Sequence, residues 1–304
     1  MNAATPSPSG TTSTPPASPN PFVAALRARW SAGRHLCVGL DPLPERIPPA
    51  FRDGVSIGEA VVAFNRAIVD ATRDHVCAYK PNAAWYEALG EDGHRALVAT
   101  VAYIHETAPG IPVLLDAKRA DIGETNARYA VAAFEVIGAD AVTVHPWFGR
   151  EALSPFLERA DKGIIVMAAN SNPGAGEVQD LPVGPGGESL AVHMARQVAG
   201  TWNALGNCGV TVGATNPERM AAVRAAVGDL PLLVLGIGAQ GGDIEAAMRA
   251  GRDSTGAGMI VSTSRAVIYA AGPDATADAT ARAADAAARA LNDRLVAALA
   301  SSRT

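Results

Sequence analysis

Short runs of consecutive apolar and β-branched residues recur along the chain from residue 36 onwards. Each run is followed by a polar turn and then by a longer stretch of helical periodicity. The apolar runs lie at residues 36–40, 76–80, 111–118, 140–146, 163–169, 208–214, 231–238 and 258–262. The helical stretches lie at residues 57–74, 91–107, 123–137, 149–160, 187–205, 216–227, 242–250 and 274–300. Apolar strands that alternate with helices are typical of a parallel sheet covered on both faces.

Eight strand–helix units in one chain of this size favour a closed (β/α)8 barrel, the TIM barrel, over an open sheet. A further helix at 22–31 precedes the first strand and is expected to cover the bottom of the barrel. We therefore predict an α/β fold with a single barrel domain over residues 21–304 that includes the C-terminal helix. Residues 1–20 contain five prolines and no charged side chain. Because this segment has too little apolar surface to offset its ordering entropy, we predict a disordered tail.

Composition excludes several classes of protein. The 25 Lys and Arg residues against 30 Asp and Glu residues give a net charge of −5, which argues against a nucleic-acid partner bound through bulk charge. The sequence lacks an uncharged apolar stretch long enough to span a membrane. The cysteines, Cys37, Cys77 and Cys208, are widely separated, so neither a disulfide framework nor a zinc site is expected. These features indicate a cytoplasmic protein.

Polar residues follow six of the eight predicted strands, and in a barrel the catalytic residues lie at the carboxyl ends of strands. Asp116 and Lys118 end the third strand. Side chains at i and i+2 of a strand point the same way, so both are expected to face the barrel mouth. Asp121 begins the next loop, while Asp41 and Lys80 follow the first two strands. A lysine flanked by carboxylates stays protonated, which suits a proton donor better than a Schiff-base nucleophile.

The segments after the seventh and eighth strands suit a phosphate group. Residues 236–242 form a glycine-rich turn that contains Gln240, and Arg265 follows the eighth strand. Glycines allow backbone N–H groups to approach an anion, and an arginine can bind phosphate oxygens in a bidentate manner. Barrels commonly bind phosphate at this place.

Two further expectations concern loops and tryptophans. Residues 170–188, rich in glycine and proline, form a long segment after the fifth strand, which indicates a lid or binding loop unless it is a tolerated surface insertion. We expect Trp85, Trp147 and Trp202 to pack in the core.

The segment LDAKRADIGET, residues 115–125, resembles the signature of orotidine 5′-phosphate decarboxylases. The resemblance covers roughly residues 22–290, and further segments are similar to the longer, type 2 branch of that family. These are LDP at 40–42, YKPN at 79–82, SNPGA at 171–175, GIGAQGG at 236–242 and STSR at 262–265. One position departs from the family pattern, since Ala169 stands where an arginine is expected.

The resemblance implies decarboxylation of orotidine 5′-phosphate to uridine 5′-phosphate, without a metal ion or an organic cofactor. It implies that Lys118 donates a proton to C6 of the pyrimidine after CO2 leaves. Asp116 would lie beside the substrate carboxylate, and Asp121 and Lys80 would complete a network of alternating charges. The residue types agree with this chemistry, because a pre-placed ammonium group can stabilise a carbanion electrostatically where no electron sink is present.

The resemblance also assigns substrate contacts and a partner. Asp41 would join Lys80 in holding the ribose hydroxyls, Ser171 would contact the pyrimidine ring, and Gln240 would join Arg265 at the phosphate. The residues that match Asp121 and Thr125 reach into the neighbouring subunit's site, so a homodimer is implied.

Two alternatives remain open from the sequence. Keto-gulonate-phosphate decarboxylases and hexulose-phosphate synthases resemble the same Asp-x-Lys-x-x-Asp layout but require Mg2+. A non-catalytic nucleotide-binding barrel would need the phosphate cradle but not a charged Lys118.

Overall fold

A computed structural model describes residues 19–237 and 243–301, and in these ranges eight parallel strands form one sheet. The strand order is β2-β1-β10-β9-β8-β5-β4-β3. Bridges between Tyr79 and Val113 and between Asn82 and Asp116 join the outer strands β2 and β3 and close the barrel. The strands are β1 (Leu36–Gly39), β2 (Val76–Lys80), β3 (Leu114–Arg119), β4 (Ala141–Val144), β5 (Gly163–Val166), β8 (Cys208–Gly213), β9 (Leu232–Leu235) and β10 (Met259–Thr263). The predicted TIM barrel is confirmed, and every predicted strand overlaps an observed one.

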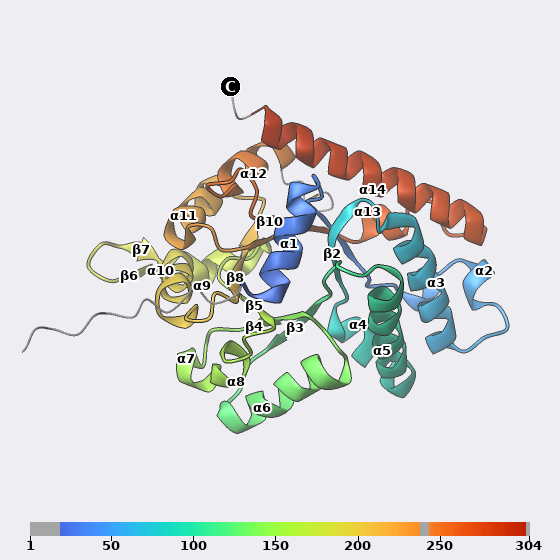
Figure 1. The fold of residues 1–304 in the computed structure, drawn as a ribbon, viewed down its shortest axis with the longest axis horizontal. Helices are drawn as coiled ribbons and strands as arrows, with labels where there is room; N and C mark the ends of the chain where they lie inside the picture. Colours follow the sequence, from blue (N-terminus) through green and yellow to red (C-terminus); the bar gives the residue numbers. More distant parts are fainter. Residues whose placement is uncertain (1–18, 238–242, 302–304) are drawn as a thin grey trace, which may run out of the picture.

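Helices surround the barrel, as Figure 1 shows. The longer ones are α3 (Ile57–Thr72), α5 (Gly90–Thr107), α6 (Gly123–Val131), α10 (Leu190–Gln197), α11 (Pro217–Val227), α12 (Ile244–Gly251) and α14 (Ala277–Ala300). Two predicted helices end in π turns, η2 (Ala132–Val136) after α6 and η4 (Val198–Trp202) after α10. The single helix expected at 149–160 is wrong, because α7 (Gly149–Ala152) and α8 (Ser154–Leu157) are separate. Pro155 explains the break, since proline cannot continue a helix but is well placed in a first turn.

The helix α1 (Pro21–Ser31) closes the bottom of the barrel, as predicted (Figure 1). Its buried face presents Phe22, Leu26 and Trp30 to the inward-facing side chains at the start of the strands. Asn20 caps the helix through a bond from the Val23 N–H, and its amide also donates to the Ala160 and Lys162 carbonyl oxygens. Residues 1–18 of the predicted tail lie outside the described residues. Asn20, which the prediction placed in the tail, contacts the barrel through Ala160 and Lys162.

The cysteines and tryptophans test the predicted core. Cys37, Cys77 and Cys208 are free and buried, and burial raises the pKa of Cys37 and of Cys208 to about 12. Trp202 is also buried, with 7% exposed. The prediction is wrong for the other two tryptophans, since Trp85 is 38% and Trp147 is 77% exposed. Both follow the carboxyl ends of strands, so they belong to the segments at the barrel mouth.

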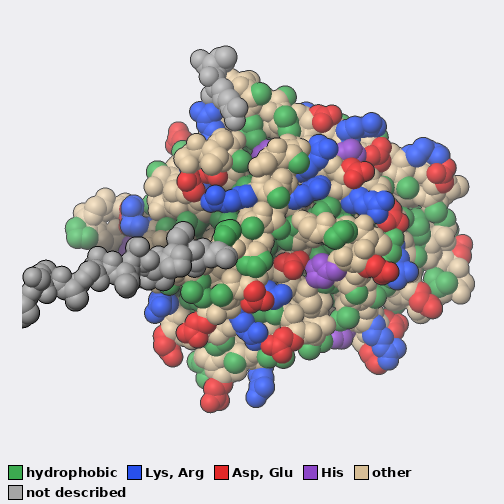
Figure 2. All heavy atoms as spheres, viewed as in Figure 1, with side chains coloured by type: hydrophobic (Ala, Val, Ile, Leu, Met, Phe, Trp, Pro, Cys, Tyr) green, Lys and Arg blue, Asp and Glu red, His purple; other side chains and the backbone are tan. Residues whose placement is uncertain are grey.

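Acidic and basic side chains are interspersed on the face that α1 closes (Figure 2). This face therefore presents no broad basic surface. Within the described ranges, no helix is both long enough and apolar enough to cross a membrane.

Candidate active site

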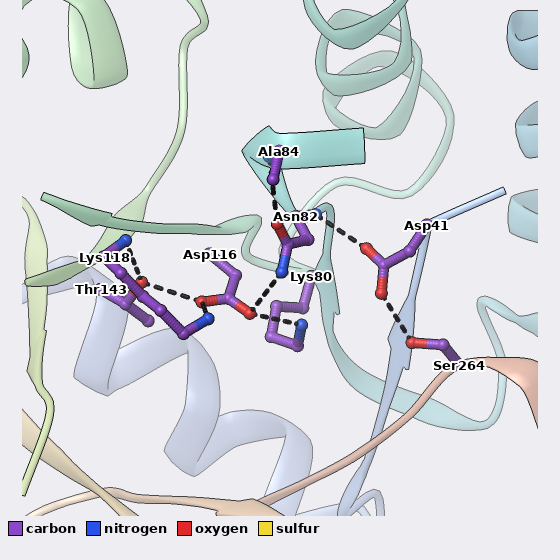
Figure 3. Close-up of polar contacts among 8 residues, drawn as sticks. All are labelled: Asp41, Lys80, Asn82, Ala84, Asp116, Lys118, Thr143 and Ser264. Atoms are coloured by element: carbon purple, nitrogen blue, oxygen red, sulfur yellow. Dashed lines mark hydrogen bonds and ion pairs between the residues drawn. The ribbon is translucent and has the colours of Figure 1, made fainter. Parts of the chain in front are cut away.

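Asp116 on β3 is the centre of a charged cluster at the barrel mouth (Figure 3). Its Oδ1 accepts hydrogen bonds from Lys118 Nζ at 2.6 Å and from Thr143 Oγ1 at 3.0 Å. Its Oδ2 accepts from Lys80 Nζ at 3.0 Å and from Asn82 Nδ2 at 3.2 Å. Three neighbouring strands and the turn after β2 thus converge on one carboxylate. The structure brings Lys80, Asp116 and Lys118 together, as the sequence predicts.

Burial and charge compete at this cluster. Burial by itself raises the pKa of the Asp116 carboxyl, but the charges and hydrogen bonds of Lys80 and Lys118 outweigh it and hold that pKa well below its usual range. Burial by itself lowers the pKa of Lys80, but the carboxylates of Asp41 and Asp116 outweigh it and raise that pKa above its ordinary value. Asp116 and Lys80 are therefore both charged across the neutral pH range.

The two lysines differ in exposure. The Lys80 side chain is 6% exposed and the Asp116 side chain 7%, whereas the Lys118 side chain is 37% exposed. Lys80 is therefore the more enclosed counter-ion of Asp116, and Lys118 is the more exposed of the two ammonium groups at the mouth.

Asp41 lies beside this cluster and connects β1 to two other segments. Its Oδ1 accepts from the Asn82 backbone N–H at 2.8 Å, and its Oδ2 accepts from Ser264 Oγ at 2.8 Å (Figure 3). Asn82 thereby contacts both Asp41 and Asp116. Asn82 and Thr143 are absent from the predicted site residues. The YKPN segment contained a signal for Asn82, but Thr143 lies in an apolar run that reads as core.

A cavity of about 270 Å³ lies at the mouth after β9 and β10. Lys80, Ser171, Gly236, Ser264 and Arg265 are among its lining residues. Gly236 has a φ of 88°, a left-handed conformation that glycine adopts without strain, and Arg265 begins the short helix α13 (Arg265–Ile268). The structure thus places Arg265 and Ser171 at one cavity. Gln240 and the rest of the glycine-rich turn from 238 to 242 lie outside the described residues.

Asp121 and Thr125 are not brought to the charged cluster of the same chain. Asp121 Oδ1 accepts from the Ile122 N–H at 2.7 Å. Thr125 lies in the first turn of α6 and lines a groove of about 860 Å³ between α6 and α8, together with Arg128 and Pro155. In the described part of the chain, neither side chain hydrogen-bonds to Asp116, and Thr125 faces this groove.

The long segment after β5 is partly ordered into small elements. It contains η3 (Pro173–Ala175), α9 (Gly176–Gln179) and a two-stranded hairpin of β6 (Pro182–Val183) and β7 (Glu188–Ser189). Gln179 Oε1 accepts from the Asn170 N–H at 2.8 Å and so ties α9 to the end of β5. Ala169, where the family pattern has an arginine, is fully buried, and its N–H donates to the Thr211 carbonyl oxygen. In this chain that position belongs to the core.

In the described part of the chain, no three or more His, Cys, Asp or Glu side chains are grouped so that they could hold a metal ion. The cluster offers charged donors and acceptors on strand ends, next to a cavity that Arg265 lines. This arrangement suits electrostatic stabilisation of a reacting anion and transfer of a proton from an ammonium group.

Comparison with known proteins identifies the family. The model of the "Orotidine 5'-phosphate decarboxylase / HUMPS family" matches residues 34–280. The orotidine 5′-phosphate decarboxylase of Azoarcus sp. (strain BH72) is 50% identical over 250 residues, which are 82% of this chain and 90% of the relative.

Solved structures agree. The OMP decarboxylase of Leishmania donovani has a TM-score of 0.78 and 35% identity, over 91% of this chain and 98% of that chain. The UMP synthase of the same organism has a TM-score of 0.80 and 36% identity over 93% of this chain, but the match spans only 57% of the synthase. The motifs, the barrel and these matches agree, and the chain belongs to the orotidine 5′-phosphate decarboxylase / HUMPS family.

Proposed function

We propose that this chain decarboxylates orotidine 5′-phosphate to uridine 5′-phosphate in pyrimidine biosynthesis, with Lys118 as the proton donor and without a metal ion or an organic cofactor. The 50% identity with a decarboxylase over most of both chains supports the activity. The observation that carries the role of Lys118 is its ion pair with the buried Asp116 carboxylate, combined with an ammonium group that stays partly exposed at the mouth.

In the proposed reaction, the bond between C6 of the pyrimidine and the carboxylate breaks, and its electron pair stays on C6. The Lys118 ammonium group stabilises the developing carbanion and then gives it one proton, so the products are CO2, uridine 5′-phosphate and a neutral lysine amine that solvent reprotonates. Because Asp116 is held in its ionised form by two lysines, the positive charges are fixed before substrate arrives and need no reorganisation during the reaction.

The remaining predicted contacts bind the phosphate, the ribose and the pyrimidine ring of the nucleotide. Arg265, at the cavity after β9 and β10, binds the phosphate. Gln240, which lies outside the described residues, is predicted to bind the same group. Ser171, which lines the same cavity, contacts the pyrimidine ring, and Asp41 and Lys80 hold the ribose hydroxyls. Binding energy at the phosphate, far from C6, can then orient the ring and help to close the site.

We further propose that the working form is a homodimer in the cytoplasm, in which Asp121 and Thr125 complete the partner's site. Support comes from the lack of a hydrogen bond from either residue to Asp116 in the described part of its own chain, and from the groove beside Thr125. Large apolar side chains are exposed in the segments after β3 and β4, with Ile122 at 61%, Trp147 at 77% and Phe148 at 52%. Exposed apolar clusters at segment ends commonly mark protein–protein interfaces.

The test is an absorbance assay on orotidine 5′-phosphate that compares the parent chain with Lys118→Ala, each with and without excess chelator. We expect Lys118→Ala to lower turnover by more than about 100-fold, because the reaction loses its positioned acid. Binding of uridine 5′-phosphate stays measurable, since the phosphate contacts remain. Turnover of the parent is unchanged by chelator.

Each alternative gives a different result. Loss of parental activity in chelator would favour a Mg2+-dependent barrel of the synthase type. Nucleotide binding without turnover in the parent would indicate a non-catalytic binding barrel. Full turnover by Lys118→Ala would refute the role proposed for the lysine.

A further inference from the structure

Thr143 is a fully buried polar residue on β4, in an otherwise apolar strand. Its Oγ1 accepts a hydrogen bond from the Lys118 backbone N–H at 2.9 Å and donates one to Asp116 Oδ1 at 3.0 Å (Figure 3). A hydroxyl has one proton to donate, and here it goes to the carboxylate, so a lone pair must receive the amide. The one hydroxyl thus contacts both the backbone of Lys118 and the carboxylate that holds its ammonium group.

The need for this hydroxyl comes from the pairing of β3 with β4. Leu115 pairs with Val142 and Arg119 pairs with Val144, so the three residues 116–118 of β3 lie opposite Thr143 alone. Such a bulge disrupts the ladder of backbone hydrogen bonds and leaves amides that need another acceptor. The Thr143 side chain supplies that acceptor to Lys118.

Lys118 also has a φ of 49°, and it is the one non-glycine residue with a positive φ in the described part of the chain. This left-handed conformation is unfavourable for a residue with a side chain and persists where the surroundings enforce it. It re-aims the side chain after the bulge, so that Lys118 Nζ returns to Asp116 at 2.6 Å. In an extended strand, the backbone of Lys118 would carry its side chain in another direction.

We propose that Thr143 is a positioning residue for the decarboxylation, which holds Lys118 in its left-handed backbone conformation and fixes the carboxylate that aims the ammonium group. This inference rests on the role of Lys118 as proton donor. Removal of the hydroxyl leaves a buried N–H without its acceptor and frees the lysine backbone to relax. Asp116 keeps its bonds from Lys80 and Asn82, so the charged cluster itself persists and only the aim of Lys118 changes.

The decisive variants are Thr143→Val, which keeps the shape and removes the hydroxyl, and Thr143→Ser, which keeps the hydroxyl. Thr143→Ala removes the hydroxyl without placing a methyl group against the Lys118 amide, and so serves if the valine variant does not fold. Thr211→Val is the matched control. Thr211 on β8 is equally buried, and its Oγ1 accepts from the uncharged Ala168 N–H on the neighbouring chain segment at 3.0 Å.

The measurements are kcat on orotidine 5′-phosphate per binding-competent site, counted by titration with uridine 5′-phosphate, and the Kd for that nucleotide. We expect Thr143→Val and Thr143→Ala to lower kcat by about 10- to 100-fold, the size of effect expected for one misplaced catalytic group. The Kd stays close to the parental value, Thr143→Ser regains most of kcat, and Thr211→Val keeps it.

Three outcomes would overturn the inference. They are parental kcat in both variants that lack the hydroxyl, a loss in Thr143→Ser as large as in Thr143→Val, and an equal loss of kcat in Thr211→Val. Lys118→Ala separates this inference from the proposed function. If Lys118→Ala is inactive while Thr143→Val is fully active, only the role proposed for Thr143 is refuted. If Lys118→Ala is active, the role of Lys118 as proton donor is refuted as well.

Discussion

At the residue scale, Asp116 forms ion pairs with two lysines that have different roles. The Lys80 side chain is 6% exposed, whereas the Lys118 side chain is 37% exposed. A buried carboxylate with a single lysine would keep that lysine as its counter-ion, whereas a second, enclosed lysine leaves Lys118 available to a ligand. The depressed pKa of Asp116 ensures that the arrangement persists at any pH near neutrality.

The sequence predicted these residues for a reason that is only partly right. Regular strand alternation was expected to place Asp116 and Lys118 on one side, yet β3 is bulged there and Lys118 has a positive φ. The side chains still meet, because the bulge and the left-handed residue compensate each other. The sequence alone cannot reveal this bulge, because the Lys118 N–H that it leaves unpaired is bound by Thr143 of another strand.

Arg265 allows a prediction about specificity at the same scale. It lines the cavity after β10, and a charged hydrogen bond to a phosphate is worth about 1.5–3 kcal/mol. We expect Arg265→Ala to weaken binding of uridine 5′-phosphate by about 10- to 100-fold, measured by calorimetric titration. Binding of uridine, which lacks the phosphate, stays at the parental value.

Arg282→Ala is the matched control, because Arg282 lies on α14 and pairs with Asp278 of the same helix. It should bind both ligands as the parent does. An equal loss of uridine binding in Arg265→Ala would mean that Arg265 does not act through the phosphate.

At the element scale, strands were predicted more reliably than the segments that leave the barrel mouth. Consecutive apolar residues identify a strand buried on both faces, and helical periodicity identifies the helices that cover it. The helix α4 (Ala83–Glu87) and the hairpin β6–β7 have neither pattern and were not predicted. Tertiary bonds hold these segments in place, such as the one from Tyr86 Oη of α4 to the Leu40 carbonyl oxygen.

The contact between α1 and β5 gives a prediction about the closed end of the barrel. A Cβ on Gly163, the first residue of β5, would lie 2.2 Å from Phe22 Cδ1, and the Phe22 ring is buried. We expect Gly163→Ala to lower the free energy of unfolding by about 1–3 kcal/mol in urea denaturation, since the ring has to move within a packed core. Turnover is retained, because Gly163 lies at the opposite end of the strand from the mouth.

Gly200→Ala is the control for the chemistry of the substitution. Gly200 lies in η4 and would place its Cβ in open space, so the variant should be as stable as the parent or slightly more stable. Equal stability of the two alanine variants would show that α1 does not need the close approach at Gly163.

At the scale of the whole molecule, the net charge of −5 and the anionic substrate are compatible, because charge is organised locally. Acidic and basic side chains are interspersed over the α1 face, whereas Lys80, Lys118 and Arg265 are gathered at the strand ends. The barrel topology achieves this, since it brings the carboxyl ends of all eight strands to one mouth. Composition alone could not predict that concentration of positive charge.

The proposed homodimer leads to a prediction that needs two chains. In the described part of the chain, Asp121 does not hydrogen-bond within the charged cluster, so the proposed shared site requires the partner to supply this residue. Asp121→Ala and Lys118→Ala are each expected to be inactive alone. A heterodimer of the two has one site with an intact Lys118 that receives an intact Asp121 from the partner.

Random pairing of equal amounts makes about half of the dimers heterodimers, each with one active site of two. The mixture should therefore regain about one quarter of parental activity per subunit. The measurement is turnover after the mixed chains have exchanged, with exchange verified by differently tagged subunits. If exchange is complete and activity does not return, Asp121 acts within its own subunit and the shared site is wrong.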